Sequence, residues 1–268
     1  MGKSAKLGQN FLRDKKIACR IVGLLAAPAG PLLEIGAGKG ILSGLLLEKF
    51  PGRRITLVEI DPAMATELEH RFGDRAVITG GDILRTDLAE TYPKERVAVI
   101  GNLPYHISKL LIDWFIAQRQ KISEAVLMLQ KDFVDKLLAE AGSKKYNAQS
   151  VVFQLLFQTR RCFDVPPGAF APAPKIISTV LAVQSADASL QGKVDDFYDF
   201  AKRCFAERRK TLWNNLAPHI EKDLLASMFE TCGLEQRVRG EQLPANSFYE
   251  LFLSANKPTA LDAEEKNM

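Results

Sequence analysis

The chain has 268 residues, of which 47% are hydrophobic and 25% charged, and its formal net charge is +4. This length and composition indicate an ordinary folded protein with one sizeable domain and a smaller one, and they exclude disordered, collagen-like and disulfide-rich chains. Since no apolar stretch approaches the length of a bilayer span, we expect no membrane association.

The spacing of the cysteines and the placement of charge narrow the possible class of protein further. The four cysteines are Cys19, Cys162, Cys204 and Cys232. They lack both paired spacing and a histidine at ligand spacing, which predicts free thiols in a reducing cytoplasm and no metal site. The first 20 residues carry six basic side chains and one acidic side chain. Such a basic arm suits a phosphate-rich partner, although solvated lysines alone would give the same count.

Between residues 32 and 184, short apolar runs alternate with amphipathic stretches. The predicted strands are 32–35, 55–60, 76–79, 97–100 and 125–129, and the predicted helices are 41–50, 62–72, 108–118 and 131–141. This alternation predicts an α/β fold with a parallel, doubly wound sheet. Two further strand-like runs, 151–159 and 176–183, lack a long helix between them and predict an antiparallel pair at one edge.

The pattern changes near residue 185, where a polar linker precedes a helical remainder. The predicted helices there are 194–217, 220–232 and 247–255, followed by a frayed tail from about residue 256. The predicted organisation is therefore a first domain over 1–184, which includes the basic arm, and a small helical domain over 185–268.

Small and acidic residues follow the first three predicted strands. The turn at 36–40 (GAGKG) opens a helix, and its glycines let the backbone approach a ligand. Glu59 ends the second strand, where a carboxylate can accept both ribose hydroxyls, and Asp82 follows the third, where it could accept from an adenine amino group. Each alone is equally explained by a tight turn or a capping carboxylate, but together they favour a nucleotide-like cofactor.

The fourth predicted strand ends in the segment 102–105 (NLPY). Pro104 fixes its own backbone and pushes Leu103 toward an extended conformation. The Leu103 carbonyl and the Asn102 side-chain oxygen can then face one pocket, where two neutral acceptors suit an exocyclic amino group. Tyr105 beside them offers an aromatic face on which a base can stack.

These residues resemble the class I methyltransferases that use S-adenosylmethionine and methylate amino groups. The likeness is closer still to one family, the bacterial small-subunit (16S) ribosomal RNA adenine N6-dimethyltransferases linked to kasugamycin sensitivity. It rests on segments in the family's order: 8–12 (GQNFL), 34–38 (EIGAG), 58–61 (VEID), 102–108 (NLPYHIS), 170–176 (FAPAPKI) and 206–212 (AERRKTL).

The resemblance implies a Rossmann-like fold and S-adenosylmethionine as the cofactor. By similarity, the cofactor-binding residues are Asn10, Leu12, Gly36, Gly38, Glu59, Ile60, Asp82, Ile83 and Asn102. The residues around the target adenine are Asn102, Leu103, Pro104, Tyr105 and Phe170. Phe170 would be a second aromatic wall, and its flanking prolines predict a stiff surface loop rather than a core position.

The implied activity is dimethylation of N6 on two adjacent adenines near the 3′ end of 16S ribosomal RNA. The resemblance further implies a cytoplasmic monomer that acts on the small ribosomal subunit late in its assembly. Hydrogen bonds from N6–H to the Asn102 and Leu103 oxygens would favour the charge that develops on nitrogen, so that neither a strong base nor a metal is required. In-line alignment and desolvation would supply most of the rate.

Basic residues of the second domain are candidates for RNA binding. At 100° per residue, the predicted helix 194–217 gathers four of them on one solvent-facing side: Lys202, Arg203, Arg209 and Lys210. Such a patch suits RNA phosphates, although a merely solvated face would look the same. Arg208 falls on the apolar side, where we expect it to pair within the protein.

Two other functions share some of these features. The erythromycin-resistance methyltransferases share the Asn-x-Pro-Tyr segment but modify large-subunit RNA, and the segments 170–176 and 208–212 fit the small-subunit family better. A non-catalytic RNA-binding or ribosome-assembly factor could retain the fold. Such a factor would have little need of Glu59, Asp82, Asn102 and Tyr105 together.

Overall fold

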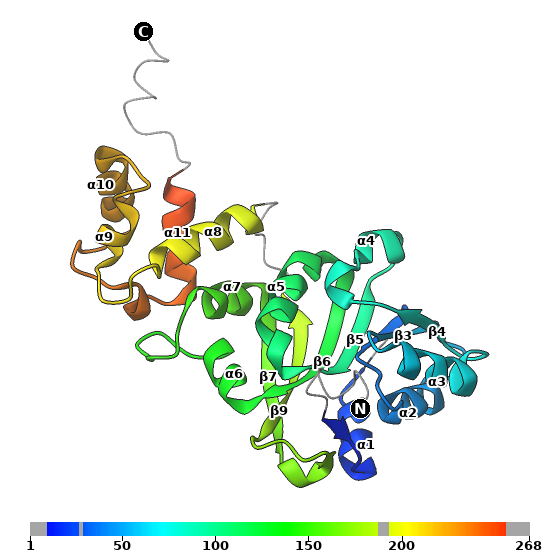
Figure 1. The fold of residues 1–268 in the computed structure, drawn as a ribbon. Helices are drawn as coiled ribbons and strands as arrows, with labels where there is room; N and C mark the ends of the chain where they lie inside the picture. The colour runs from blue at the N-terminus through cyan, green and yellow to red at the C-terminus, as the bar shows by residue number, and fades with distance from the viewer. Residues whose placement is uncertain (1–9, 27–28, 187–192, 256–268) are drawn as a thin grey trace. The chain divides into compact units, whose positions relative to one another are not determined.

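The computed structural model describes residues 10–26, 29–186 and 193–255 (Figure 1). Residues 1–9 of the predicted basic arm, the linker at 187–192 and the tail from 256 lie outside the described residues. Contacts divide the chain into two units. The first comprises Met1–Val134 and Phe157–Ala186, and the second comprises Asp135–Leu156 and Asp187–Met268.

Seven strands form the sheet of the first unit: β2 (Leu32–Ile35), β3 (Ile55–Glu59), β4 (Val77–Gly80), β5 (Val97–Asn102), β6 (Ile122–Gln130), β7 (Phe157–Val165) and β9 (Ser178–Ser185). Their order is β4-β3-β2-β5-β6-β9-β7. The pairs from β4 to β6 are parallel, whereas β9 is antiparallel to both β6 and β7. The predicted parallel sheet with an antiparallel edge pair is confirmed.

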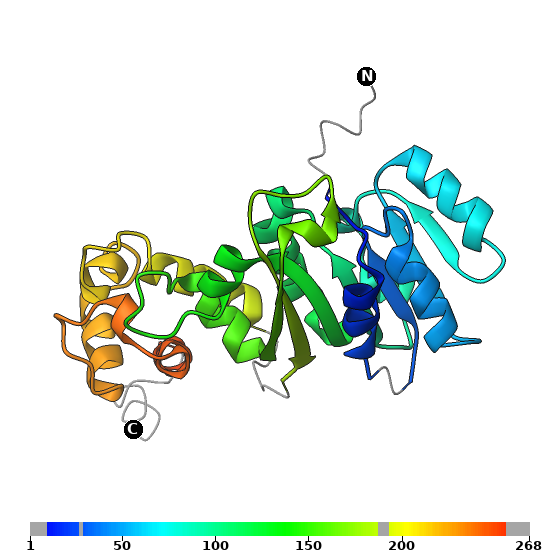
Figure 2. The same ribbon diagram turned by 90° about the horizontal axis from the view of Figure 1, so that it is seen from below.

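Helices cover both faces of this sheet (Figure 2). They are α1 (Lys15–Gly23), α2 (Ile41–Lys49), α3 (Pro62–Phe72), α4 (Leu88–Thr91) and α5 (Ser108–Gln118). The first three share one hydrophobic cluster with the inward side chains of β2, β3, β5 and β6. Leu57 of β3 belongs to this cluster, so its neighbour Thr56 points to the other face of the sheet. There the Tyr92 hydroxyl, just after α4, donates to Thr56 Oγ1 at 2.8 Å.

Local signals explain why these elements begin where they do. Asp14 and Asp61 accept hydrogen bonds from the first backbone N–H groups of α1 and α3, and Pro62 occupies the first turn of α3. Strands β2 and β3 are buried along their whole length, as expected for central strands covered on both faces. No helix within the described ranges is both long and apolar enough to cross a membrane.

The predicted strand 151–159 is wrong over its first half. Residues Ala148–Leu156 form helix α7, and only from Phe157 onward does the chain become strand β7. The Asn147 side-chain oxygen accepts from Gln149 N at 2.9 Å and from Ser150 N at 3.3 Å, which caps the helix. The β-branched pair Val151–Val152 favours a strand in isolation, but the cap and the burial of nearly the whole helix outweigh that preference.

The second unit is helical, as predicted. Beside α7 it contains α8 (Val194–Cys204), α9 (Leu212–Leu216), α10 (Lys222–Thr231) and α11 (Ala245–Ser254), and α6 (Lys131–Leu137) leads into it. Aromatic rings fill its core. The Phe252 ring contacts Phe197 edge-on and Phe200 at a tilt, and Phe205 stacks on Phe248 with ring centroids 5.3 Å apart.

The unit boundary differs from the predicted one. The boundary between Ala186 and Asp187 agrees with the change in sequence pattern near residue 185. However, Asp135–Leu156 groups with the C-terminal helices rather than with the sheet. The physical reason is the identity of α7, because its buried side chains pack against α8 instead of joining β7 as a strand. The predicted first domain, 1–184, therefore contains an excursion into the second unit.

The predicted helix 194–217 is also two helices, because a turn separates Cys204 from Leu212. The buried Asn215 side chain holds that turn. Its oxygen accepts from Glu207 N at 3.1 Å, and its nitrogen donates to Cys204 O at 3.1 Å and to Glu207 O at 3.2 Å. Since the helix is interrupted, Lys202 and Arg209 do not share one helical azimuth.

We predict that Asn215→Ala destabilises the protein by about 1–3 kcal/mol, because it leaves buried backbone groups of the turn without partners. Urea unfolding measures the change. The exposed neighbour Asn214 provides the control, and Asn214→Ala should change the free energy of unfolding by less than about 0.5 kcal/mol. Equal effects of the two substitutions would contradict the assignment of Asn215 as the residue that holds the turn.

Candidate active site

The loop between β2 and α2 forms the floor of the site. Gly38 and Gly40 adopt left-handed backbone conformations, with φ of 53° and 70°. A Cβ atom on Gly38 would lie 3.2 Å from the Phe11 ring, and one on Gly40 would lie 2.7 Å from the Phe72 ring. Glycine is therefore required at both positions, for backbone angle and for space.

Glu59, at the end of β3, fixes this loop against the next strand. One carboxylate oxygen accepts from Gly38 N at 2.8 Å and the other accepts from Asp61 N at 2.9 Å. The side chain is only 3% exposed, so these bonds hold its orientation firmly. Glu59 thereby presents its remaining lone pairs at the carboxyl edge of the sheet.

One pocket collects most of the predicted site residues. Those that line it are Asn10, Leu12, Gly36, Gly38, Glu59, Ile60, Asn102, Leu103, Pro104 and Tyr105. They come from the N-terminal segment and from the ends of β2, β3 and β5, which lie side by side in the sheet. The pocket therefore lies where parallel sheets bind their ligands.

Asp82 and Ile83 lie outside the lining of this pocket. They follow β4 at the same edge, where Gly81 N donates to Glu59 O at 2.9 Å. The Asp82 carboxylate accepts from Leu84 N at 3.0 Å and caps the short helix η2 (Ile83–Arg85). A capping role is therefore observed for Asp82, and its predicted contact with a cofactor stays a prediction.

Asn102 and Leu103, whose oxygens are the predicted acceptors, both line the pocket. The Asn102 Nδ2 atom donates to the Asn10 carbonyl at 3.1 Å, which turns the amide oxygen away from that contact. Leu103 N donates to Met128 O at 3.0 Å and so extends the pairing of β5 with β6. Within the described part of the chain, neither Asn102 Oδ1 nor the Leu103 carbonyl accepts a hydrogen bond.

Tyr105 is held at its hydroxyl end. It begins the short helix η3 (Tyr105–Ile107), and Pro104 precedes that helix with an extended backbone. The Tyr105 hydroxyl and Ser178 Oγ are 2.6 Å apart, and burial raises the pKa of this phenol above its ordinary value. The ring therefore has a fixed position at the pocket, and Ser178 is a supporting residue that the sequence did not reveal.

The predicted surface position of Phe170 is wrong. Phe170 is 1% exposed and belongs to the hydrophobic cluster beneath α1. It lies in β8 (Phe170–Ala171), which pairs with β1 (Phe11–Leu12) of the N-terminal segment. The flanking prolines do form a loop, but the hydrophobic cluster, which includes the cross-strand partner Leu12, buries this side chain. Its role as an aromatic wall therefore stays a prediction without a contact that supports it.

Glu34 is a pocket residue to which the sequence assigned no role. Its side chain is 1% exposed and accepts a hydrogen bond from Ser43 Oγ at 2.7 Å. Burial raises the pKa of Glu34 to about 8; the Ser43 hydroxyl opposes this shift, and the nearby Glu59 charge adds to it. A protonated carboxyl therefore lies beside Glu59 at neutral pH.

The predicted RNA-binding residues are all exposed on the second unit: Lys202, Arg203, Arg209 and Lys210. Two of them form surface ion pairs, Lys202 with Asp199 at 3.0 Å and Lys210 with Glu207 at 2.6 Å. The internal pairing expected for Arg208 is confirmed, since its guanidinium donates to the Ser143 and Tyr146 carbonyls.

No group of three or more potential metal ligands comes together among the described residues.

Comparison with known proteins places the chain among ribosomal RNA-modifying enzymes. A family model described as ribosomal RNA adenine dimethylase matches residues 2–257. Relatives named ribosomal RNA small subunit methyltransferase A include one from Geobacter sulfurreducens, 40% identical over 91% of this chain and 92% of the relative. Another, from Acidobacterium capsulatum, is 37% identical over 89% of this chain and 86% of its own.

Solved structures agree at the level of the fold. A dimethyladenosine transferase from Plasmodium falciparum superposes with a TM-score of 0.78 at 25% identity, covering 92% of this chain and 97% of that one. The 23S rRNA methyltransferase ErmE superposes with a TM-score of 0.71 at 23% identity, covering 92% and 100%. The predicted class I methyltransferase fold is confirmed.

Glu34 gives the site a dependence on pH that Glu34→Gln should remove. Between the ordinary pKa of 4.5 and the folded value of about 8, the folded protein holds a proton that the unfolded chain has released. This group should therefore lower the free energy of unfolding by about 1.4 kcal/mol per pH unit as pH rises through that range, with no further loss above it.

Urea titrations at pH 5.5, 6.5, 7.5 and 8.5 test this prediction. The Glu34→Gln variant should lose that part of the pH dependence, whereas the exposed Glu48→Gln control should retain it. A parallel pH dependence in all three proteins would show that Glu34 is ionised in the folded state.

Proposed function

The chain belongs to the ribosomal RNA adenine dimethylase family, and from that premise we propose that it dimethylates N6 of two adjacent adenines near the 3′ end of small-subunit ribosomal RNA. It is a methyltransferase that uses S-adenosylmethionine. The small-subunit relatives support this choice of substrate over large-subunit RNA. The observation that carries the proposal is the pair of neutral acceptors, Asn102 Oδ1 and Leu103 O, at the pocket.

The pocket suits S-adenosylmethionine. Glu59 ends β3 with a fixed carboxylate that can accept ribose hydroxyls, and Gly36 and Gly38 leave room for the methionine part. Ile60 is 48% exposed at the same pocket, which is unusual for a large aliphatic side chain and suits the face of an adenine ring. Asn10 and Leu12 close the pocket from the N-terminal side. The bound cofactor supplies a methyl group that is already activated by a sulfonium.

The protein's own contribution is to position and polarise the target nitrogen. The N6 lone pair of adenine is delocalised into the ring, so N6 is a weak nucleophile. Asn102 Oδ1 and the Leu103 carbonyl can each accept one N6–H, which favours the positive charge that grows on nitrogen during attack. The methylated N6 then loses one proton to water and still carries one N–H, so that one of the same acceptors can serve a second transfer.

The adenine must leave its stack to reach these acceptors, which costs a few kcal/mol. Tyr105 offsets part of this cost, because its ring lies at the pocket and its hydroxyl is tied to Ser178. We further propose that Arg203 and Arg209, with Lys202 and Lys210, bind RNA phosphates on the second unit. The enzyme would act as a cytoplasmic monomer on late small-subunit particles.

Asn102→Ala tests the chemical role of the acceptor pair. Removing one such group typically costs 10²–10³-fold in rate, so labelled methyl transfer to unmethylated small subunits should fall by about that factor. Subunit binding should stay nearly intact, since the amide contributes little area. Equal loss of binding and transfer would argue against a separate chemical role.

The wild-type protein decides between the competing substrates in the same assay. Transfer to small subunits with almost none to large subunits supports the proposal, and the reverse pattern would replace it with large-subunit methylation. Binding to small subunits without any transfer would indicate a non-catalytic assembly factor.

The Arg203→Ala/Arg209→Ala double variant tests the RNA-binding surface. If each guanidinium contacts one phosphate, the slope of log affinity against log salt should fall by about two, with a uniform loss of affinity. Arg237→Ala, an exposed arginine of the same unit, should leave the slope unchanged. An unchanged slope in the double variant would show that Arg203 and Arg209 do not contact RNA phosphates.

A further inference from the structure

Two adjacent isoleucines are exposed in the loop that precedes β9. Ile176 is 41% exposed and Ile177 is 42% exposed. The other large hydrophobic side chains exposed within the described residues occur singly along the chain: Ile60, Val77, Leu110 and Leu253. Two neighbouring exposed aliphatic side chains form a small apolar surface, larger than that of a single exposed residue.

This pair directly precedes Ser178, the residue that holds Tyr105. Ile177 directly precedes Ser178, whose hydroxyl is 2.6 Å from the Tyr105 hydroxyl. The Ile177 carbonyl accepts from Lys131 N at 3.0 Å, where β6 ends beside the start of β9. The two isoleucines therefore lie within two residues of the side chain that holds Tyr105, outside the lining of the pocket.

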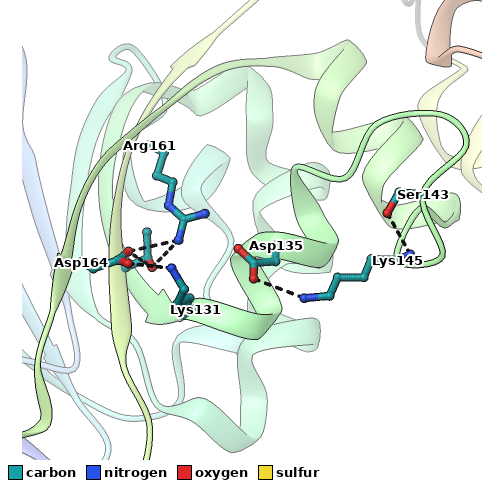
Figure 3. Close-up of polar contacts among 7 residues, drawn as sticks. Lys131, Asp135, Ser143, Lys145, Arg161 and Asp164 are labelled. Atoms are coloured by element: carbon teal, nitrogen blue, oxygen red, sulfur yellow. Dashed lines mark hydrogen bonds and ion pairs between the residues drawn. The ribbon is translucent and has the colours of Figure 1, made fainter.

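A network of charged and polar groups fixes the base of this loop (Figure 3). The Asp164 carboxylate accepts from Lys131 Nζ at 2.7 Å, from Thr179 Oγ1 at 2.7 Å and from Arg161 Nη2 at 3.1 Å. These contacts hold the pKa of Asp164 well below its ordinary value. The network joins β7, β9 and the start of α6 next to the pair Val165–Ser178, at which the loop begins and ends.

The loop therefore presents Ile176 and Ile177 from a rigid base. The Arg13 guanidinium donates to Gly168 O at 3.2 Å, and Arg13 N donates to Ala169 O at 2.8 Å, so its earlier part is also held. Such an arrangement suits insertion into a nucleic acid, because proteins that unstack bases commonly place rigid apolar side chains between the steps.

We propose that Ile176 and Ile177 form an aliphatic wedge that occupies the space left in the RNA stack when the target adenine enters the pocket beside Tyr105. The wedge replaces stacking that the extruded base has lost and prevents its return. Lys175, exposed and adjacent in the chain, contributes a positive charge near the RNA backbone. This role rests on the proposed function, since it requires an RNA adenine as the substrate.

The test uses the full chain and unmethylated small subunits, with labelled S-adenosylmethionine. The Ile176→Ala/Ile177→Ala double variant should lose at least about tenfold in kcat/KM for the subunit, because stacking of one base is worth that much. Its Kd for S-adenosylmethionine and its thermal midpoint should stay at wild-type values. Ile176→Leu/Ile177→Leu should recover most of the activity, since aliphatic bulk is retained.

The control is Val77→Ala, which removes an exposed β-branched side chain at the opposite edge of the sheet. Wild-type kcat/KM in the double alanine variant, or an equal loss in the Val77 control, would overturn the wedge while leaving the proposed function intact. A loss of cofactor binding together with activity would also overturn it, in favour of a structural role. If the wild-type protein itself fails to methylate small subunits, the proposed function is wrong, and the wedge that rests on it is wrong as well.

Discussion

The hydrogen bond from Asn102 Nδ2 to the Asn10 carbonyl is the contact on which the site depends. The two terminal atoms of a planar amide point apart, so the bond that holds the nitrogen also aims the oxygen. The same bond anchors the N-terminal segment across the pocket, and the pairing of β1 with β8 anchors it from the other side. The position of the N-terminal segment at the pocket and the orientation of the Asn102 amide are therefore coupled.

Two carboxyl groups share this pocket, and their surroundings differentiate them. Glu59 receives a backbone N–H on each oxygen, whereas Glu34 receives one hydroxyl and is otherwise enclosed. Burial consequently raises the pKa of Glu34 to about 8, so that it is mostly neutral at pH 7. The pocket avoids the repulsion of two adjacent carboxylates while keeping a fixed anionic acceptor at the end of β3.

Much of the sheet could be predicted because its signals are local. The bounds of β2, α3 and α5 match the predicted ranges, since short apolar runs flanked by glycine, aspartate or proline carry their own limits. Two wrong predictions, the strand 151–159 and the single helix 194–217, share one cause. Asn147 caps α7 and Asn215 holds the turn after α8 through side chain to backbone bonds that hydrophobic periodicity does not record. The surface position predicted for Phe170 was wrong for another reason, because pairing with a strand from the other end of the unit brings Phe170 into the hydrophobic cluster.

The candidate site likewise contains residues that local sequence signals predict and one that they do not. Glu59 and Asn102 could be predicted because parallel strands bring their carboxyl ends to one edge, so position in the chain implies position in space. Ser178 could not, because it reaches Tyr105 across 73 residues. Its place depends on the register of β9 against β6, in which Ser178 pairs with Gln130. A slip of one residue would turn Ser178 to the opposite face and release the Tyr105 hydroxyl. The antiparallel strand β9 therefore holds the Tyr105 ring in place at the pocket.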